Sequence, residues 1–107
     1  MNKQEFNKKC SKFLGYNHFY PYFDNWNWIM QVINKIETIH DDFHGYFGVH
    51  INSNSCTIQG TKLRTEIGNV HPAYSVETIA ETKLEATIIS IDKFLDWHQT
   101  IQTTTHQ

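Results

Sequence analysis

The sequence predicts one α+β domain, in which a small antiparallel sheet of two to four strands packs with two or three helices. Three observations lead to this fold class. Apolar side chains recur at helical spacing over about 3–14, 25–40 and 78–101. Apolar residues alternate on both sides of a short polar segment, which predicts a central hairpin at about 46–59. The length of 107 residues suits a single domain over 1–107 with one modest core.

The first helix, over 3–14, is predicted from one apolar face. Phe6, Cys10 and Phe13 follow one another at i, i+4 and i+7, and the lysines lie largely elsewhere. Gly15 is placed to end this helix, because glycine adopts the left-handed conformation of a helix C-terminus without strain.

The second helix, over 25–40, has an unusually wide apolar surface, which spans more than half of the helical circumference. Asp24 is the expected N-cap residue. An amphipathic surface helix has a narrower apolar face, so we expect this helix to be covered from two sides and to form the spine of the fold.

The second half of the chain is predicted to contain one further strand and one long helix. Leu63 to Ile67 alternates as a third strand, Gly68 to Pro72 is expected to be a loop, and 73–76 is ambiguous. The helix is expected to begin near Thr78, where Thr78 and Glu81 have capping-box spacing. We expect the tail to fray from about residue 103.

Composition and charge exclude several classes of protein. The formal net charge of −2 argues against a general nucleic-acid binder. Two cysteines do not make a disulfide framework, so we expect free thiols in a reducing compartment, the cytoplasm. The sequence contains no apolar run long enough for a membrane span, so no membrane partner is expected. One local exception is a basic first helix, which is either a solvated face or a nucleic-acid site made of Lys3, Lys8, Lys9 and Lys12.

Residues 13–28 hold eight of the fifteen aromatic side chains, and such a cluster builds either a core or a contact surface. We expect the core set to be Phe13, Phe19, Phe23 and Trp26. The tyrosines each carry a polar end, so the candidate contact residues are Tyr16, Tyr20 and Tyr22. Base stacking on these rings would require nearby cations, which this segment lacks apart from His18. Contact with a protein is therefore the better interpretation.

The last helix presents an acidic stripe of four carboxylates: Glu81, Glu85, Asp92 and Asp96. Ile89 lies beside the stripe at a position expected to face water, and Trp97 flanks the apolar face on its other side. This stripe is either a solvated helix face or a surface that meets a basic groove of a partner protein, of the kind that an RNA-guided nuclease uses for nucleic acid.

Histidines are the best candidates for chemistry in this sequence. His40 and His44 have the i, i+4 spacing that allows two imidazoles to share a metal ion, with His50 on the next strand, but the helix is expected to end there. No nucleotide-binding, nucleophile-elbow or metalloprotease motif occurs. We therefore predict a protein that is not an enzyme, with no catalytic residues, no metal site and no cofactor.

Two segments, 22–37 and 82–98, carry a resemblance to known proteins. The first reads YFDNWNWIMQVI followed by KIE, and the second reads TKLEAT followed by IDKFLDWH. Together they resemble small proteins encoded by bacteriophages and prophages, some of which are grouped as phage α-β-α sandwich domains. In those proteins a Trp-containing helix with Ile-Glu near its end precedes a short sheet, and the last helix ends in Phe-x-x-Trp and a second aromatic. Here His98 takes the place of that aromatic. The family offers no catalytic residues to transfer.

The resemblance implies a phage protein that binds one host protein. Its sharpest form is an anti-CRISPR protein, which inhibits a CRISPR effector nuclease or its guide-RNA complex in the host cytoplasm and so evades host defence. This step is analogy. Two alternatives stay open: an accessory or homo-oligomeric module of the phage, such as a homodimer, and RNA or single-stranded DNA binding by the basic first helix.

Overall fold

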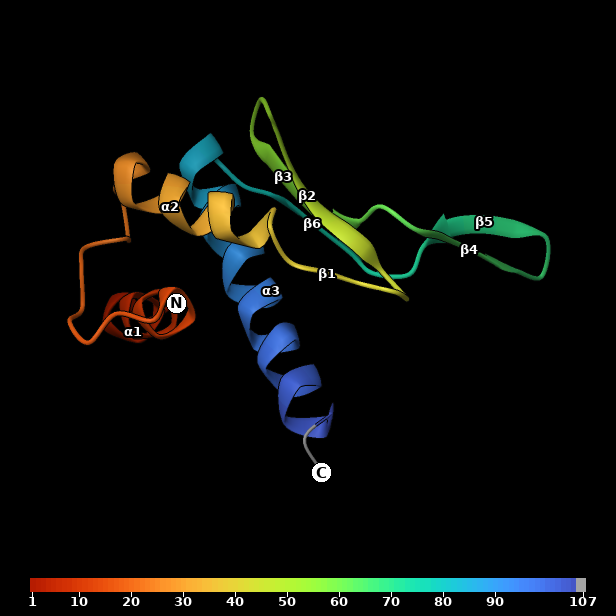
Figure 1. Ribbon diagram of the computed structural model, residues 1–107. Coiled ribbons are helices and arrows are strands. Elements are labelled where there is room, and N and C mark those ends of the chain that lie inside the picture. Colours follow the sequence, from red (N-terminus) through yellow and green to blue (C-terminus); the bar gives the residue numbers. More distant parts are fainter. Residues whose placement is uncertain (106–107) are drawn as a thin grey trace.

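The computed structural model describes residues 1–105, and the side chains of residues 1–102. The described chain forms three helices, a four-stranded antiparallel sheet and a separate two-stranded sheet, which confirms the predicted α+β class (Figure 1). In chain order the elements are α1 (Lys3–Leu14), α2 (Trp26–Ile36), β1 (His40–Asp41), β2 (Gly45–Asn52), β3 (Ser55–Gly60), β4 (Leu63–Glu66), β5 (Asn69–Pro72), β6 (Ser75–Ile79) and α3 (Lys83–Thr105).

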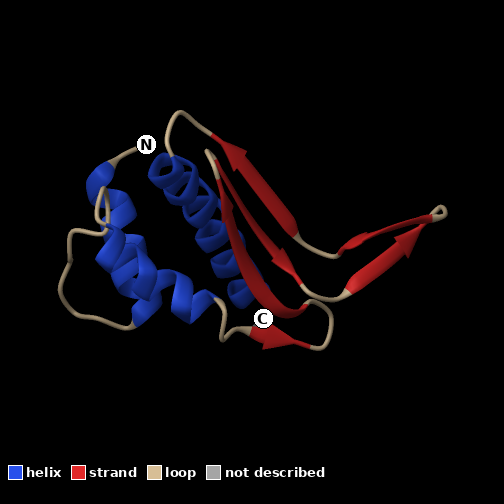
Figure 2. Ribbon diagram, turned by 90° about the horizontal axis from the view of Figure 1, so that it is seen from above, coloured by secondary structure: helices blue, strands red, loops and turns tan. Residues whose placement is uncertain are grey.

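The main sheet has the strand order β1-β2-β3-β6, and the predicted central hairpin is its β2–β3 pair. All three helices lie on the same side of this sheet, and α3 packs directly across β3 and β6 (Figure 2). Because side chains alternate along a strand, the residues that share a register position also share a face. The pairs Val49–Ile58 and Cys56–Thr78 therefore face the helices.

The core lies between this inner face of the sheet and the three helices. Ile58 of β3, Ile29 of α2, Phe94 of α3 and Phe6 of α1 are each almost completely buried. Burying an aliphatic or aromatic side chain of this size contributes about 1.5–3 kcal/mol, so this apolar contact dominates the stability of the domain.

A polar contact inside the core ties α3 to two strands at once. Ser90 Oγ lies 2.8 Å from the Cys56 carbonyl oxygen and 2.8 Å from Thr78 Oγ1, and both Ser90 and Thr78 are buried. A serine hydroxyl this close to a strand carbonyl requires the backbones of α3 and β3 to approach closely. The contact therefore fixes where α3 sits along the sheet.

The first helix agrees with its prediction. α1 spans Lys3–Leu14 and buries Phe6 and Cys10, and Gly15 ends it in the left-handed conformation with φ 83°. The Gly15 N–H donates to the Lys12 carbonyl, which satisfies a terminal acceptor of the helix.

The second helix is shorter than predicted, and its cap is a different residue. Asp24 has a φ of 62° and lies outside the helix, whereas the Asn25 side chain accepts hydrogen bonds from the backbone of Asn27 and Trp28. The helix ends at Ile36, because 40–41 pair with β2 as strand β1. The apolar surface of α2 is also covered less completely than predicted. This helix contacts α1, β2 and α3, yet Trp26 and Met30 stay 36% and 44% exposed.

The prediction for the second half of the chain was wrong at two points, the loop 68–72 and the start of the last helix. The expected loop 68–72 contains strand β5, and 75–79 form strand β6 because they complete the sheet beside β3. Thr78 therefore lies in a strand, and the N-terminal cap of α3 is Thr82, whose hydroxyl accepts from the Glu85 N–H. The backbone of α3 is helical to Thr105, and residues 106–107 lie outside the described residues.

The assignment of the α2 cap to Asn25 leads to a stability prediction. Asn25→Ala should lower the free energy of unfolding by about 1 kcal/mol, because two N–H groups of the first turn lose their acceptor. Asp24→Gly is the matched control and should stay within about 0.5 kcal/mol, since glycine accepts the positive φ at this position. Urea denaturation of both variants measures the difference, and a larger loss for Asp24→Gly would contradict the assignment.

Candidate partner-binding surfaces

The most prominent surface feature is a two-stranded ribbon, β4–β5, that projects away from the rest of the molecule (Figures 1 and 2). Three apolar side chains of this ribbon are exposed: Leu63 by 58%, Val70 by 62% and Ile67 completely. The register places Leu63, Thr65, Val70 and Pro72 on one face. The ribbon therefore carries an apolar face and an apolar tip with no packing role in the described domain.

The tip of the ribbon holds an isoleucine in a strained backbone conformation. Ile67 and Gly68 form the turn with φ values of 47° and 80°, the pattern of a type I′ turn. Asparagine, aspartate or glycine normally occupies the first of these positions, because a β-branched residue at positive φ is disfavoured. The turn therefore presents a bulky apolar side chain at a cost that no contact within the described structure offsets.

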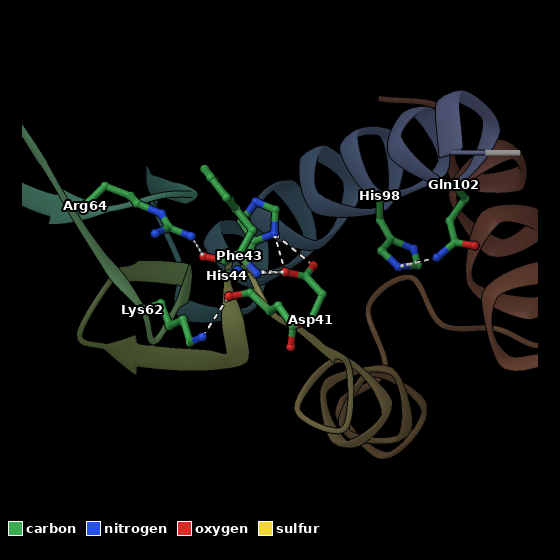
Figure 3. Close-up of polar contacts among 8 residues, drawn as sticks. Asp41, Phe43, His44, Lys62, Arg64, His98 and Gln102 are labelled. Carbon is green, nitrogen blue, oxygen red and sulfur yellow. Dashed lines mark hydrogen bonds and ion pairs between the residues drawn. The ribbon is translucent and has the colours of Figure 1, made fainter. Parts of the chain in front are cut away.

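The base of the ribbon is held by the turn between β1 and β2, as Figure 3 shows. Lys62 Nζ donates to the Asp42 carbonyl at 2.7 Å, and Arg64 Nη2 donates to the Phe43 carbonyl at 2.6 Å. The Arg64 guanidinium also lies 3.8 Å from the centre of the Phe43 ring. Charge-assisted hydrogen bonds and a cation–π contact together set the direction in which the ribbon projects.

Asp41 organises the turn between β1 and β2. Its carboxylate accepts hydrogen bonds from the backbone N–H groups of Phe43 and His44 and lies 2.8 Å from the His44 ring Nδ1 (Figure 3). Partial burial acts to raise the pKa of Asp41, but the hydrogen bonds from His44 outweigh it and leave the pKa lowered. The carboxylate stays ionised at neutral pH and keeps the turn ordered.

The histidine pair that suggested a metal site does not have the required geometry. His40 lies in strand β1 and stacks on Tyr46, while the His44 ring is held by Asp41, so the two are not on one helix turn. His50 lies on the outer face of β2. Among the residues whose placement the structure describes, no three His, Cys, Asp or Glu side chains are grouped so that they could hold a metal ion.

The acidic stripe is divided by the fold. Lys9 of α1 reaches α3, where its Nζ lies 2.8 Å from a carboxylate oxygen of Asp92 and 2.8 Å from one of Asp96. Burial acts to lower the pKa of Lys9, but the hydrogen bonds to the two aspartates outweigh it and the pKa is raised. These two aspartates hold α1 against α3, although Asp96 stays exposed, whereas Glu81 and Glu85 are exposed and form no ion pair with any described residue.

The two residues predicted to flank the acidic stripe, Ile89 and Trp97, lie in different parts of the structure. Ile89 and Glu85 line a groove of about 370 Å³ together with Leu84, Ile88 and Phe23. Trp97 instead stacks on Tyr74 with ring centres 3.8 Å apart and packs beside Phe47, as part of an aromatic cluster over the sheet. The structure thus brings Glu85 and Ile89 together at one groove and places Trp97 in a different, half-buried layer.

The tyrosine prediction is wrong for Tyr22, which is completely buried with its hydroxyl 3.4 Å from Ser11 Oγ. Tyr16 is 43% exposed, and Tyr20 is half-buried because it stacks on Trp28. The core prediction is wrong for Phe19, which is 63% exposed, and for Trp26, which is 36% exposed. The loop has no period, so only tertiary packing decides which of its rings point inward.

The lysines of the predicted basic helix have separate contacts. Lys3 pairs with Asp24 at 3.7 Å and lies over the Phe23 ring, whereas Lys8 lies over the exposed Phe19 ring. Lys9 is held by the two aspartates, and Lys12 lines a groove between α1 and α3. The tertiary structure thus brings cations to the aromatic loop, although one of the four lysines is already neutralised.

Neither cysteine is placed as a nucleophile. Cys10 and Cys56 are free and fully buried, and burial raises the pKa of the Cys10 thiol to about 12. At neutral pH both are protonated thiols without access to solvent.

The ribbon residues Leu63, Ile67 and Val70 are the functional candidates that the sequence analysis missed. A turn at Ile67-Gly68 between two alternating runs is a recognisable hairpin signal, but Leu63 and Ile67 also fit a strand with a buried face. Comparison with known proteins finds no matching family model, no matching curated protein and no matching solved structure. No helix in the described part of the chain has the length and apolar character needed to cross a membrane.

The link between Lys9 and the two aspartates leads to a pH-dependent prediction. Lys9→Met should lower the free energy of unfolding by about 1 kcal/mol at neutral pH, because Asp92 is left half-buried without its cation. Since the folded pKa of Lys9 is raised, its contribution is complete below the unfolded value of 10.5 and is lost as the pH rises through the folded value. Urea denaturation curves of wild type and variant should therefore converge in strongly alkaline solution.

Lys8→Met is the matched control for this experiment. Its ammonium lies over the exposed Phe19 ring and contacts no carboxylate in the described structure, so the change should be under about 0.5 kcal/mol. A loss for Lys9→Met that persists at alkaline pH would show that packing of the side chain, and not the ion pairs, holds α1 to α3.

Proposed function

We propose that this chain is a non-enzymatic protein-binding domain that engages its partner with the β4–β5 ribbon. The observation that carries the proposal is Ile67, a completely exposed apolar residue held at positive φ on the tip of the ribbon. Strained residues persist where the surrounding structure holds them, and they concentrate at functional sites. An aliphatic side chain that enters a pocket of a partner is the use that matches this position.

The rest of the ribbon supports the same interpretation. Leu63 and Val70 extend the apolar surface from the tip along one face. The contacts of Lys62 and Arg64 with the β1–β2 turn hold the base in one orientation, which lowers the ordering cost when a partner binds. A projecting, anchored ribbon is suited to reach into a concave surface of another protein.

The kind of partner rests on the resemblance to phage proteins. On that basis we propose that the partner is a host defence protein in the cytoplasm and that binding inhibits it, in the sharpest form as an anti-CRISPR protein acting on an RNA-guided nuclease. Burial of both cysteines accords with a role that needs no nucleophile.

Nucleic-acid binding is the second candidate, and one contact favours it. Lys8 Nζ lies 5.7 Å from the centre of the exposed Phe19 ring, a pairing of cation and aromatic that suits single-stranded RNA or DNA. A mobility shift with single-stranded RNA that weakens steeply with salt would support this candidate; no shift at low salt would exclude it.

The ribbon proposal predicts that stability and binding respond in opposite directions to one substitution. Ile67→Gly should leave the protein equally stable or up to about 1 kcal/mol more stable, because glycine accepts the positive φ. The same change should weaken partner binding by roughly tenfold or more, the expected effect of losing a buried aliphatic anchor. Thermal denaturation measures the first effect, and affinity capture from host lysate followed by titration of the captured protein measures the second.

Ile79→Ser is the matched control, since Ile79 is 69% exposed on β6 and lies outside the ribbon. It should capture the same partner as wild type. Equal binding by Ile67→Gly and wild type would rule out the tip as the contact. Recovery of the chain alone would favour the homo-oligomer, and undiminished DNA cleavage by an RNA-guided nuclease in its presence would exclude the anti-CRISPR form for that nuclease.

A further inference from the structure

The two edges of the main sheet are finished differently. The strand order places β1 and β2 at one edge and β6 at the other (Figure 2). Beside β2, the Phe47 N–H donates to the Ile39 carbonyl at 3.3 Å, next to the pairs made by the short strand β1. Further along β2, the Val49 N–H donates to a carboxylate oxygen of Glu37 at 3.5 Å. The backbone donors on this edge are therefore occupied as far as Val49.

The backbone of β6 uses only one of its two sides. Just before the strand, the Gly60 N–H donates to the Tyr74 carbonyl at 3.0 Å. Just after it, the Ala80 N–H donates to the Asn54 carbonyl at 3.0 Å. Since the backbone groups of successive residues in an antiparallel strand point to opposite sides, every second residue between these contacts faces away from β3. The outward-facing residues are Ser75, Glu77 and Ile79.

The outward side of β6 is an open hydrogen-bonding edge. Among the residues that the structure describes, none hydrogen-bonds to the outward backbone groups of β6. All three outward residues are exposed, and the register with β3 runs over five consecutive pairs without a bulge. Natural edge strands are commonly protected by lysine, proline or a bulge, and β6 contains none of these. An extended segment of chain can therefore add to the sheet here.

The charge at the centre of β6 indicates what kind of segment fits. Glu77 is the charged residue of the strand, and its carboxylate accepts a hydrogen bond from the Thr57 hydroxyl at 3.2 Å. It forms no ion pair with any described residue, and the four strands of this sheet contain no lysine or arginine. A cation opposite Glu77 in an added strand supplies the opposite charge, and such cross-strand pairs stabilise a sheet.

A second copy of this chain fits the edge poorly. The symmetric antiparallel pairing that uses all three outward residues places Glu77 opposite Glu77 of the other copy. Like charges directly opposite one another destabilise a pair of strands. A shift of the register away from this position gives up part of the hydrogen bonds, because the strand has only five residues. Glu77 thus selects against self-pairing and in favour of a basic partner segment.

We propose that the outer edge of β6 binds an extended segment of another protein that places a lysine or arginine opposite Glu77. Backbone hydrogen bonds with Ser75, Glu77 and Ile79 supply the general affinity, and the ion pair with Glu77 sets the preference for basic segments. This surface is separate from the tip of the ribbon. It requires neither Ile67 nor the side chain of Ile79, so the two proposals are tested independently.

Titration of the isotopically labelled protein with the peptide acetyl-TVTKTVT-amide tests the proposal. Saturable NMR shifts should appear along 75–79. Hydrogen exchange of the three outward amides of β6 should slow about tenfold or more at saturation, whereas Val76 and Thr78, whose amides face β3, should change little. The same peptide with an N-methylated lysine keeps every side chain but lacks the N–H that faces Glu77, and it should not bind.

Charge exchange separates edge pairing from general attraction between peptide and protein. The peptide TVTETVT, with glutamate in place of lysine, should bind wild type at least about threefold more weakly, because like charges then lie opposite one another. Glu77→Lys should reverse this preference. Glu85→Lys, which makes the same change in net charge at an exposed position of α3, should retain it.

Equal binding of the two peptides by wild type, binding of the N-methylated peptide, or exchange that does not slow at the outward amides would each overturn the proposal. A wild-type dimer in which these amides are already protected would also overturn it, because the second copy would then occupy the edge.

Discussion

The close contact between α3 and the inner face of β3 is the constraint on which the rest of the structure depends. Ser90 can lie 2.8 Å from the Cys56 carbonyl only if helix and strand backbones approach closely. The contact with Thr78 extends this constraint to β6, the edge strand that precedes α3. Once α3 and β6 are fixed in this way, the ends of β3 and β6 meet at one point, and the ribbon that joins them must project from there.

Polar contacts then fix the parts that the apolar core leaves free. Lys9 joins α1 to α3 through two aspartates, so two of the four carboxylates of the acidic stripe hold these helices together. Asp41 orders the β1–β2 turn, and Arg64 fastens the ribbon to that turn. These contacts lie near the surface, and each contributes modestly to stability. Their effect is geometric, because they decide the direction of a ribbon that has no apolar packing of its own.

The proposal for the ribbon rests on a local departure from the usual residue preference of a turn. At the ribbon, Ile67 breaks the usual residue preference of its turn, and a local violation without structural compensation is expected at functional positions. A substitution that relieves the strain at Ile67 therefore separates the effect on partner binding from the effect on stability.

The sequence by itself determined the features that depend on local periodicity and local turn chemistry. These are the α+β class, the helix 3–14 with its Gly15 terminus, the central hairpin, and the presence of two further helices.

The tertiary structure decided the features for which the local sequence pattern allows more than one conformation or environment. Thr78 has a capping-box spacing, yet strand pairing with Cys56 takes it into β6. Tyr22 and Phe19 belong to one loop without a period, and packing against α1 buries the first and leaves the second exposed. Asp92 and Asp96 belong to the acidic stripe in the sequence, but Lys9, distant in sequence, pairs with both, because the fold brings α1 to α3.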